Sequence, residues 1–452
     1  MAFYRTILKK LEDWSQRERR KPLILRGARQ TGKTTVVNLF AHNFDHYIPL
    51  NLELAEDRAF FTQFDQLKDT VRAVLFSKEI PENSERILIF IDEIQSEPKA
   101  VAALRYFYED FPHLFVVAAG SLLETLLASK NTFPVGRVEY LVMRPVSFSE
   151  FLLAMNEQAA YEAMQEIPFP AYAQLKLLDL FHTYALIGGM PEVVEEYAQH
   201  RDLVLLKPIY ESLLTAYLDD VQKYATRTNR AETIRFCIEN LFLGGGKRIR
   251  FSQFANSNYD SKSIGEALRT LQQAMLLHLV YPSTDTRLPA IPNRRKSPYL
   301  QTLDTGLLNF FSGIQQALIG TKDLHEAYRG RVIHHWTGQS LLNNKHSPLD
   351  RLQFWVREKK QSMAEVDFVY LWQSKLIPIE VKAGKTGKLR SLRLYMDEAP
   401  HQLAVRVYSG DLDIHQMESQ SGRSFWLLNL PYFLVEQLDS YLAWMEAKIK
   451  EE

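Results

Sequence analysis

The feature that most constrains this chain is a glycine-bounded loop directly after an apolar segment. Residues 22–25 predict a buried strand, residues 33–42 predict a helix, and the loop between them matches GxxxxGK(S/T). Glycines let a backbone curl so that its N–H groups converge on a phosphate, and the helix N-terminus adds positive potential. The alternative is a glycine turn that caps an ordinary helix, and the strand before the loop and the helix after it weigh against that alternative. The pattern predicts a nucleotide site made of Gly27, Ala28, Arg29, Gln30, Thr31, Gly32, Lys33, Thr34 and Thr35.

A second apolar segment, residues 87–91, ends in two carboxylates, Asp92 and Glu93. An acidic pair after a strand commonly just begins a loop, but here it follows a phosphate loop. In that combination Lys33 contacts the β- and γ-phosphates, while Thr34 and Asp92 hold Mg²⁺. Glu93 is then placed to orient water as a general base. These residues predict Mg²⁺-dependent ATP binding and hydrolysis.

The order of predicted elements divides the chain. Helices and apolar strands alternate up to about residue 145, which is typical of a parallel sheet with helical crossovers. The pattern is helical over 147–218, and strands return at 352–357, 365–372 and 376–382. A chain of 452 residues predicts about two to four domains. With one cysteine and no apolar run near the roughly 18 residues that span a bilayer, we expect a cytoplasmic protein without a disulfide framework.

Several motifs in this order resemble one family. Ser121 follows a third apolar strand, Gly136-Arg137 precedes another, and further pieces are Arg144-Pro145-Val146-Ser147-Phe148 with Glu150, Gly188-Gly189-Met190-Pro191-Glu192 and Glu380-Val381-Lys382. The combination resembles prokaryotic AAA+ ATPases that carry a C-terminal PD-(D/E)XK nuclease-like domain of unknown function. The resemblance implies an α/β multidomain protein with a P-loop AAA+ core (1–145), a helical lid (146–218), a winged-helix-like domain (219–300) and a restriction-nuclease-like domain (301–452).

The same resemblance assigns further roles in the ATPase site. Ser121 takes the sensor-1 position, although a serine there also suits the N-cap of the next helix. Arg137 takes the place of an arginine finger that acts on a neighbouring subunit, which implies a homo-oligomer; the alternative is a surface or ion-paired arginine. Asn51, after the strand predicted at residues 47–50, is a candidate polar partner that holds Glu93 in an inactive position. The lid shows no obvious sensor-2 arginine.

Charge is polarised along the chain although the total balances at 54 basic and 54 acidic residues. Residues 146–215 carry 10 acidic and 3 basic residues, and residues 221–300 carry 13 basic and 5 acidic ones. Residues 251–279 predict a helix-turn-helix and a wing strand, with Lys262 and Arg269 offered to DNA. A protein-packing module remains the alternative, so the partner is DNA or protein.

Near the C-terminus, Asp367 precedes Glu380 and Lys382 by 13 and 15 residues. This spacing resembles the D-x(n)-(D/E)-x-K signature of restriction-type nucleases. Asp367 and Glu380 on adjacent strands would share a second Mg²⁺, and Lys382 would position water. Alternation on a half-buried strand also yields E-x-K. By the same resemblance, related sequences tend to carry Glu where this chain reads Arg331-Val332-Ile333-His334-His335, and a histidine there weakens the case for a metal site. The domain is therefore an active nuclease or a catalytically silent binding domain.

The sequence thus predicts an Mg²⁺-dependent AAA+ ATPase whose nucleotide state switches a C-terminal half that binds DNA or a protein partner. Two alternatives remain open. One is an ATP-gated DNA nuclease, and the other is a slow-hydrolysing signalling switch. No membrane partner is expected.

Overall fold

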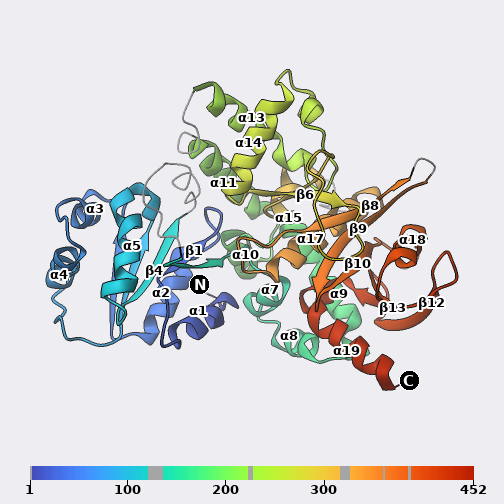
Figure 1. The fold of residues 1–452 in the computed structure, drawn as a ribbon, viewed down its shortest axis with the longest axis horizontal. Helices are drawn as coiled ribbons and strands as arrows, with labels where there is room; N and C mark the ends of the chain where they lie inside the picture. The colour runs from blue at the N-terminus through green and yellow to red at the C-terminus, as the bar shows by residue number, and fades with distance from the viewer. Residues whose placement is uncertain are drawn as a thin grey trace. The chain divides into compact units, whose positions relative to one another are not determined.

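A computed structural model describes residues 3–120, 136–221, 228–315, 326–359, 362–384 and 388–451 (Figure 1). The chain forms two compact units. The first contains residues 1–144 with two short returns of the chain, 273–275 and 346–349, and the second contains the remainder.

The first unit is built on a parallel sheet in the order β2-β3-β4-β1-β5. β1 (Leu23–Arg26), β3 (Ile87–Asp92) and β4 (Phe115–Gly120) lie where apolar segments predict strands. The other two strands are β2 (His46–Asn51) and β5 (Glu139–Val142). Because β1, β4 and β3 are neighbours and run in parallel, the loops that follow them lie at the same, carboxyl end of the sheet. The predicted α/β class is confirmed.

Both faces of this sheet are covered by helices, as a parallel sheet requires. Alternation along β3 sends Ile89 to one face and Phe90 to the other, and both are buried. The Phe90 face packs against α1 (Ile7–Ser15) and α2 (Lys33–Phe40). The Ile89 face packs against α3 (Ala55–Thr62), α4 (Leu67–Ser77) and α5 (Pro98–Asp110) (Figure 1).

The second unit begins with a helical region, as predicted. Its helices are α7 (Phe148–Ala154), α8 (Gln158–Gln165), α9 (Gln174–Ile187), α10 (Pro191–His200) and α11 (Lys207–Asp219). Ser147 and Glu150 form a capping box at the start of α7. The turn after α9 needs glycine, because Gly188 has φ +76° and a Cβ there would lie 2.2 Å from the Asp304 carboxylate. Asp304 in turn accepts the N–H of Gly189 at 2.6 Å.

The basic segment contains α13 (Thr228–Gly244), a 3₁₀ turn (Phe251–Asn256) and α14 (Ser261–Gln273). An antiparallel hairpin of β6 (Leu277–Ser283) and β7 (Tyr299–Thr302) follows. β6 also pairs in parallel with β8, with Tyr281 opposite Gln353. The hairpin is therefore part of the large sheet of the second unit.

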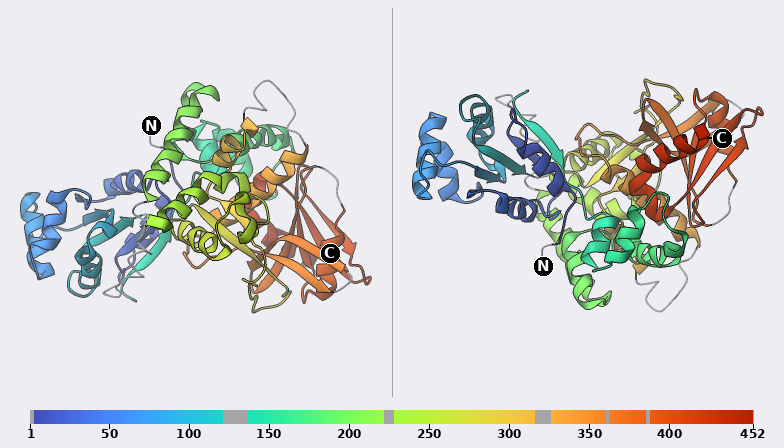
Figure 2. Two further views of the ribbon diagram at one scale, coloured as in Figure 1. Left: turned by 90° about the horizontal axis from the view of Figure 1, so that it is seen from above. Right: turned by 90° about the horizontal axis from the view of Figure 1, so that it is seen from below.

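That large sheet is mixed and has the order β12-β13-β11-β10-β9-β8-β6-β7 (yellow to red in Figure 2). Its remaining strands are β8 (Gln353–Lys359), β9 (Ser362–Trp372), β10 (Lys375–Val381), β11 (Leu403–Tyr408), β12 (Asp413–Glu418) and β13 (Ser424–Pro431). The associated helices are α15 (Thr305–Phe311), α17 (Glu326–Asn343), α18 (Arg390–Glu398) and α19 (Leu438–Glu451). No helix in the described ranges is long and apolar enough to cross a membrane.

Candidate functional site

The glycine-rich loop connects the carboxyl end of β1 to the N-terminus of α2. Two of its residues have left-handed backbones, Gln30 with φ 63° and Gly32 with φ 90°. Gly27 is confined by space, because a Cβ would lie 2.6 Å from the Met143 carbonyl oxygen. The loop is therefore wrapped tightly around the start of α2, where helix N–H groups lack carbonyl partners and suit a phosphate.

Lys33 and Thr34 begin α2 and have different neighbours. The Lys33 ammonium is buried and donates to the carbonyl oxygens of Gly27 and Ala28, both at 3.0 Å. The Thr34 hydroxyl donates to a carboxylate oxygen of Asp92 at 2.6 Å. Two hard oxygen ligands thus meet between the loop and the end of β3, and this donor set fits Mg²⁺.

Glu93 follows Asp92 with an unusual backbone, φ 49° and ψ 44°, which is rare for a residue with a side chain. Burial raises the pKa of the Glu93 carboxyl, while a hydrogen bond from Gln95 and the charge of Lys33 oppose that rise. A base with a raised pKa accepts a proton more readily, which suits general-base catalysis near neutral pH.

The residue that contacts Glu93 is Gln95, whose side-chain amide donates to the carboxylate. Sequence reasoning pointed to Asn51 instead. The Asn51 side-chain oxygen accepts the N–H of Glu53 at 3.0 Å, and its own N–H donates to Asp57 at 2.8 Å. Gln95 was missed because its role depends on the left-handed turn at Glu93, although a polar side chain two residues beyond the acidic pair was a usable signal.

Arg137 lies in the turn before β5, with 44% of its side chain exposed, and pairs with Glu109 at 2.8 Å. Glu109 also accepts from Arg105 at 3.1 Å, and the hydrogen bond from Arg137 is the largest cause that holds the pKa of this carboxyl low. The predicted sensor Ser121 comes directly after β4 but lies outside the described residues. The geometry shows an ion-paired Arg137 within one copy of the chain.

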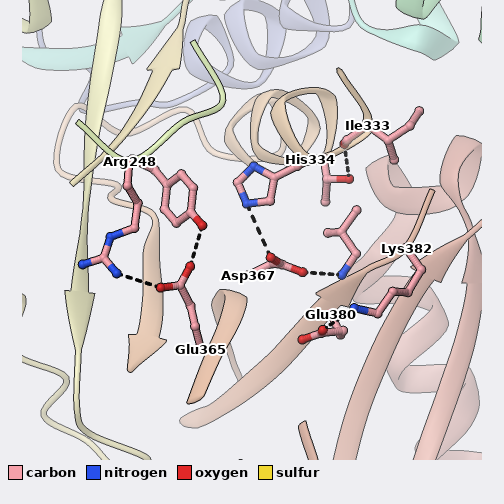
Figure 3. A network of polar contacts seen from close by, with 10 residues as sticks. Arg248, Ile333, His334, Glu365, Asp367, Glu380 and Lys382 are labelled. Atoms are coloured by element: carbon pink, nitrogen blue, oxygen red, sulfur yellow. Dashed lines mark hydrogen bonds and ion pairs between the residues drawn. The ribbon is translucent and has the colours of Figure 1, made fainter. Parts of the chain in front are cut away.

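The C-terminal residues meet on adjacent strands. Asp367 on β9 accepts the N–H of Val381 at 2.8 Å, and Lys382 donates to Glu380 at 2.6 Å (Figure 3). Burial, followed by the charge of Asp367, raises the pKa of the Glu380 carboxyl, against the pull of Lys382. The second Glu380 oxygen is buried and has no hydrogen-bond partner among the described residues.

Further side chains extend this cluster beyond Asp367, Glu380 and Lys382. Glu365 shares a strand face with Asp367 and binds Arg248 at 2.9 Å and the Tyr299 hydroxyl at 2.5 Å. The ring of His334 stacks on Phe368 and lies 3.8 Å from an Asp367 oxygen (Figure 3). Within the described ranges, no group of three or more His, Cys, Asp or Glu side chains is arranged to hold a metal ion.

Comparison with known proteins agrees with the geometry of the first unit. Residues 19–152 match a protein family described as an AAA domain. This part of the chain is therefore similar to an AAA domain. The match implies ATP as the ligand and spans both the glycine-rich loop and the Asp92-Glu93 pair. Residues 178–318 and 329–433 match two further families, each described as a domain of unknown function (DUF8612 and DUF4143).

Individual relatives are distant. An uncharacterised protein of Methanocaldococcus jannaschii is 23% identical over 302 residues, which cover 62% of this chain and 60% of that protein. The matched part thus spans less than two thirds of this relative. A Walker-type ATPase of Pyrococcus abyssi superposes with a TM-score of 0.44 at 15% identity, over 69% of this chain and 96% of that one. C. elegans PCH-2 gives 0.29 at 12% identity, over 44% and 64%.

Proposed function

We propose that the AAA domain binds ATP with Mg²⁺ and hydrolyses it. The observation that carries the proposal is the 2.6 Å hydrogen bond from Thr34 to Asp92, which joins the start of α2 to the end of β3. Two segments 58 residues apart thereby present a phosphate loop, two oxygen ligands and a general base in one place.

Contacts among the described residues support roles for Lys33, Thr34, Asp92, Glu93 and Gln95. The loop N–H groups and Lys33 bind the phosphates, and Glu93 orients water and accepts its proton. Thr34 and Asp92 would hold Mg²⁺, which neutralises phosphate charge when bound. Gln95 keeps the Glu93 carboxylate in position. Ser121 is proposed as the residue that senses the γ-phosphate.

The experiment that tests this function compares nucleotide binding with turnover in the full chain. Glu93→Gln removes the base but keeps the side-chain shape, so we expect ATP binding to persist while kcat falls about 10²- to 10⁴-fold. Glu56→Gln, an exposed position on α3, is the matched control and should retain full activity. A wild-type protein that does not bind ATP would refute the proposal.

We further propose that ATP hydrolysis switches a C-terminal half that binds DNA or a protein partner. The supporting observation is charge, because residues 221–300 carry 13 basic against 5 acidic residues. Lys262 and Arg269 on α14 are the proposed DNA contacts in a winged-helix-like module. A DNA partner is supported if the protein binds duplex DNA with an affinity that falls steeply with salt and if DNA stimulates ATPase turnover. A slow ATPase that DNA does not stimulate would instead favour a signalling switch that times a protein contact.

A second candidate function belongs to the C-terminal cluster, namely metal-dependent cleavage of DNA by Asp367, Glu380 and Lys382. It is favoured by a buried oxygen of Glu380, beside Lys382, for which the described part of the chain supplies no hydrogen-bond partner. With metal bound by the two carboxylates, Lys382 would position the attacking water. The side chain that lies 3.8 Å from Asp367 is a histidine, His334, and not a third carboxylate. This favours a binding domain without catalysis.

Plasmid DNA incubated with Mg²⁺ or Mn²⁺, with and without ATP, separates these readings. Cleavage by the wild type that is lost in Lys382→Ala but kept in Lys388→Ala, an exposed lysine, supports the nuclease. No cleavage under any of these conditions leaves the domain as a binding module.

A further inference from the structure

A buried arginine outside the phosphate-binding motif touches the back of the loop. Arg5 lies just before α1 and is only 5% exposed. One of its terminal nitrogens donates to the carbonyl oxygen of Thr31 at 3.1 Å, and the other donates to the carbonyl oxygen of Arg144 at 2.6 Å. The guanidinium therefore ties the loop between β1 and α2 to the chain that leaves β5.

The first of these contacts fixes the orientation of one peptide group. The carbonyl of Thr31 and the N–H of Gly32 belong to the same planar trans peptide and point in opposite directions. Because Arg5 holds the carbonyl from behind, the Gly32 N–H is turned to the opposite side. Gly32 is the N-cap of α2, so this N–H is among those that have no partner within the helix.

Charge strengthens the same effect. A hydrogen bond from a guanidinium to a carbonyl polarises the peptide, which makes its N–H a better donor to an anion. The rest of the loop leaves the peptide little freedom to turn back. Thr31 is fully buried and its hydroxyl donates to the carbonyl oxygen of Ala28 at 2.8 Å.

We propose that Arg5 is a positioning residue for nucleotide, which sets the Thr31–Gly32 peptide so that its N–H donates to a phosphate oxygen. The proposal rests on the proposed ATP site. Arg5 acts through the backbone, so it stabilises bound phosphate in the ground state and the transition state alike, which affects KM more than kcat.

The test measures Kd for a fluorescent ADP, together with KM and kcat for ATP, in the full-length protein. Arg5→Met keeps the length of the side chain and removes its charge and donors, and we expect Kd and KM to rise about tenfold to a hundredfold, with kcat within about threefold of wild type. Arg5→Lys restores one charged donor and should recover part of the affinity. Arg17→Met, which removes an exposed arginine paired with Glu139, is the control and should bind as wild type does.

The outcomes separate a positioning role from a purely structural one. The thermal midpoint of each variant without nucleotide shows whether it is folded. A folded Arg5→Met protein whose Kd for ADP is within twofold of wild type overturns the inference about Arg5 but does not affect the proposed ATP site. If Arg5→Met does not fold, the Arg5→Lys variant decides the question, because a lysine donates with a different geometry. A wild-type Kd for ADP in Arg5→Lys overturns the inference. A raised KM with preserved kcat supports it. A wild-type protein without nucleotide affinity overturns both proposals.

Discussion

Replacing Gly27 with alanine tests how tightly the phosphate loop is confined. A Cβ at this position would lie 2.6 Å from the Met143 carbonyl oxygen and 3.0 Å from the Thr31 hydroxyl. The Met143 side cannot simply retreat, because the Met143 N–H is hydrogen-bonded to the Arg26 carbonyl at 2.7 Å. Overpacking against a fixed backbone typically costs about 1–3 kcal/mol.

The cost should be seen in nucleotide binding. Without nucleotide, the loop of the variant relieves the clash by shifting, whereas phosphate binding requires the wild-type arrangement of N–H groups. Binding must then restore the strain, and about 1–3 kcal/mol corresponds to a loss of about 5- to 150-fold in affinity. The assay is a titration with a fluorescent ATP analogue, with the thermal midpoint measured in parallel.

Gly330→Ala is the control, since a Cβ at this helical position meets nothing within 4 Å of it. We expect that variant to bind nucleotide as the wild type does. If Gly27→Ala has both wild-type affinity and a wild-type thermal midpoint, then the conclusion that Met143 confines the loop is wrong.

Three further predictions follow from other contacts. Gln95→Ala removes a donor that stabilises the Glu93 carboxylate, so the pKa of Glu93 rises further and the acid limb of the kcat–pH profile moves to higher pH; an unmoved limb would remove Gln95 from this role. If Arg137 acts on a neighbouring subunit, Arg137→Ala loses ATPase activity that higher protein concentration does not restore. The control Arg105→Ala, which also loses a bond to Glu109, remains active. Full activity in Arg137→Ala would show that Arg137 is not the arginine finger. Asp304→Ala leaves the buried N–H groups of Gly189 and Leu307 without acceptors, so the free energy of unfolding measured in urea should fall by about 2–5 kcal/mol. An unchanged free energy of unfolding would show that Asp304 does not stabilise the Gly188-Gly189 turn.

The sequence determined the elements of the proposed ATP site because their signals are local. An apolar run that ends in Gly27 or in Asp92 predicts both the strand and the residues at its carboxyl end, and β1 and β3 lie where these runs predict them. The same holds for Asp367 and Glu380, which fall on neighbouring strands as their alternating patterns indicate. Periodicity and turn chemistry depend on neighbouring residues, so they can be read without the fold.

Only the tertiary structure decided which side chains meet across large separations. Arg5 reaches Thr31 and Arg144, and Arg248 reaches Glu365 from 117 residues away, yet none of these pairs has a spacing that predicts contact. The hairpin of β6 and β7 joins the large sheet through β8, because an open strand edge needs a hydrogen-bonding partner wherever the chain supplies one. Hydrogen bonds between distant residues depend on how the elements pack, and packing is set by the whole core, which no single segment of the sequence encodes.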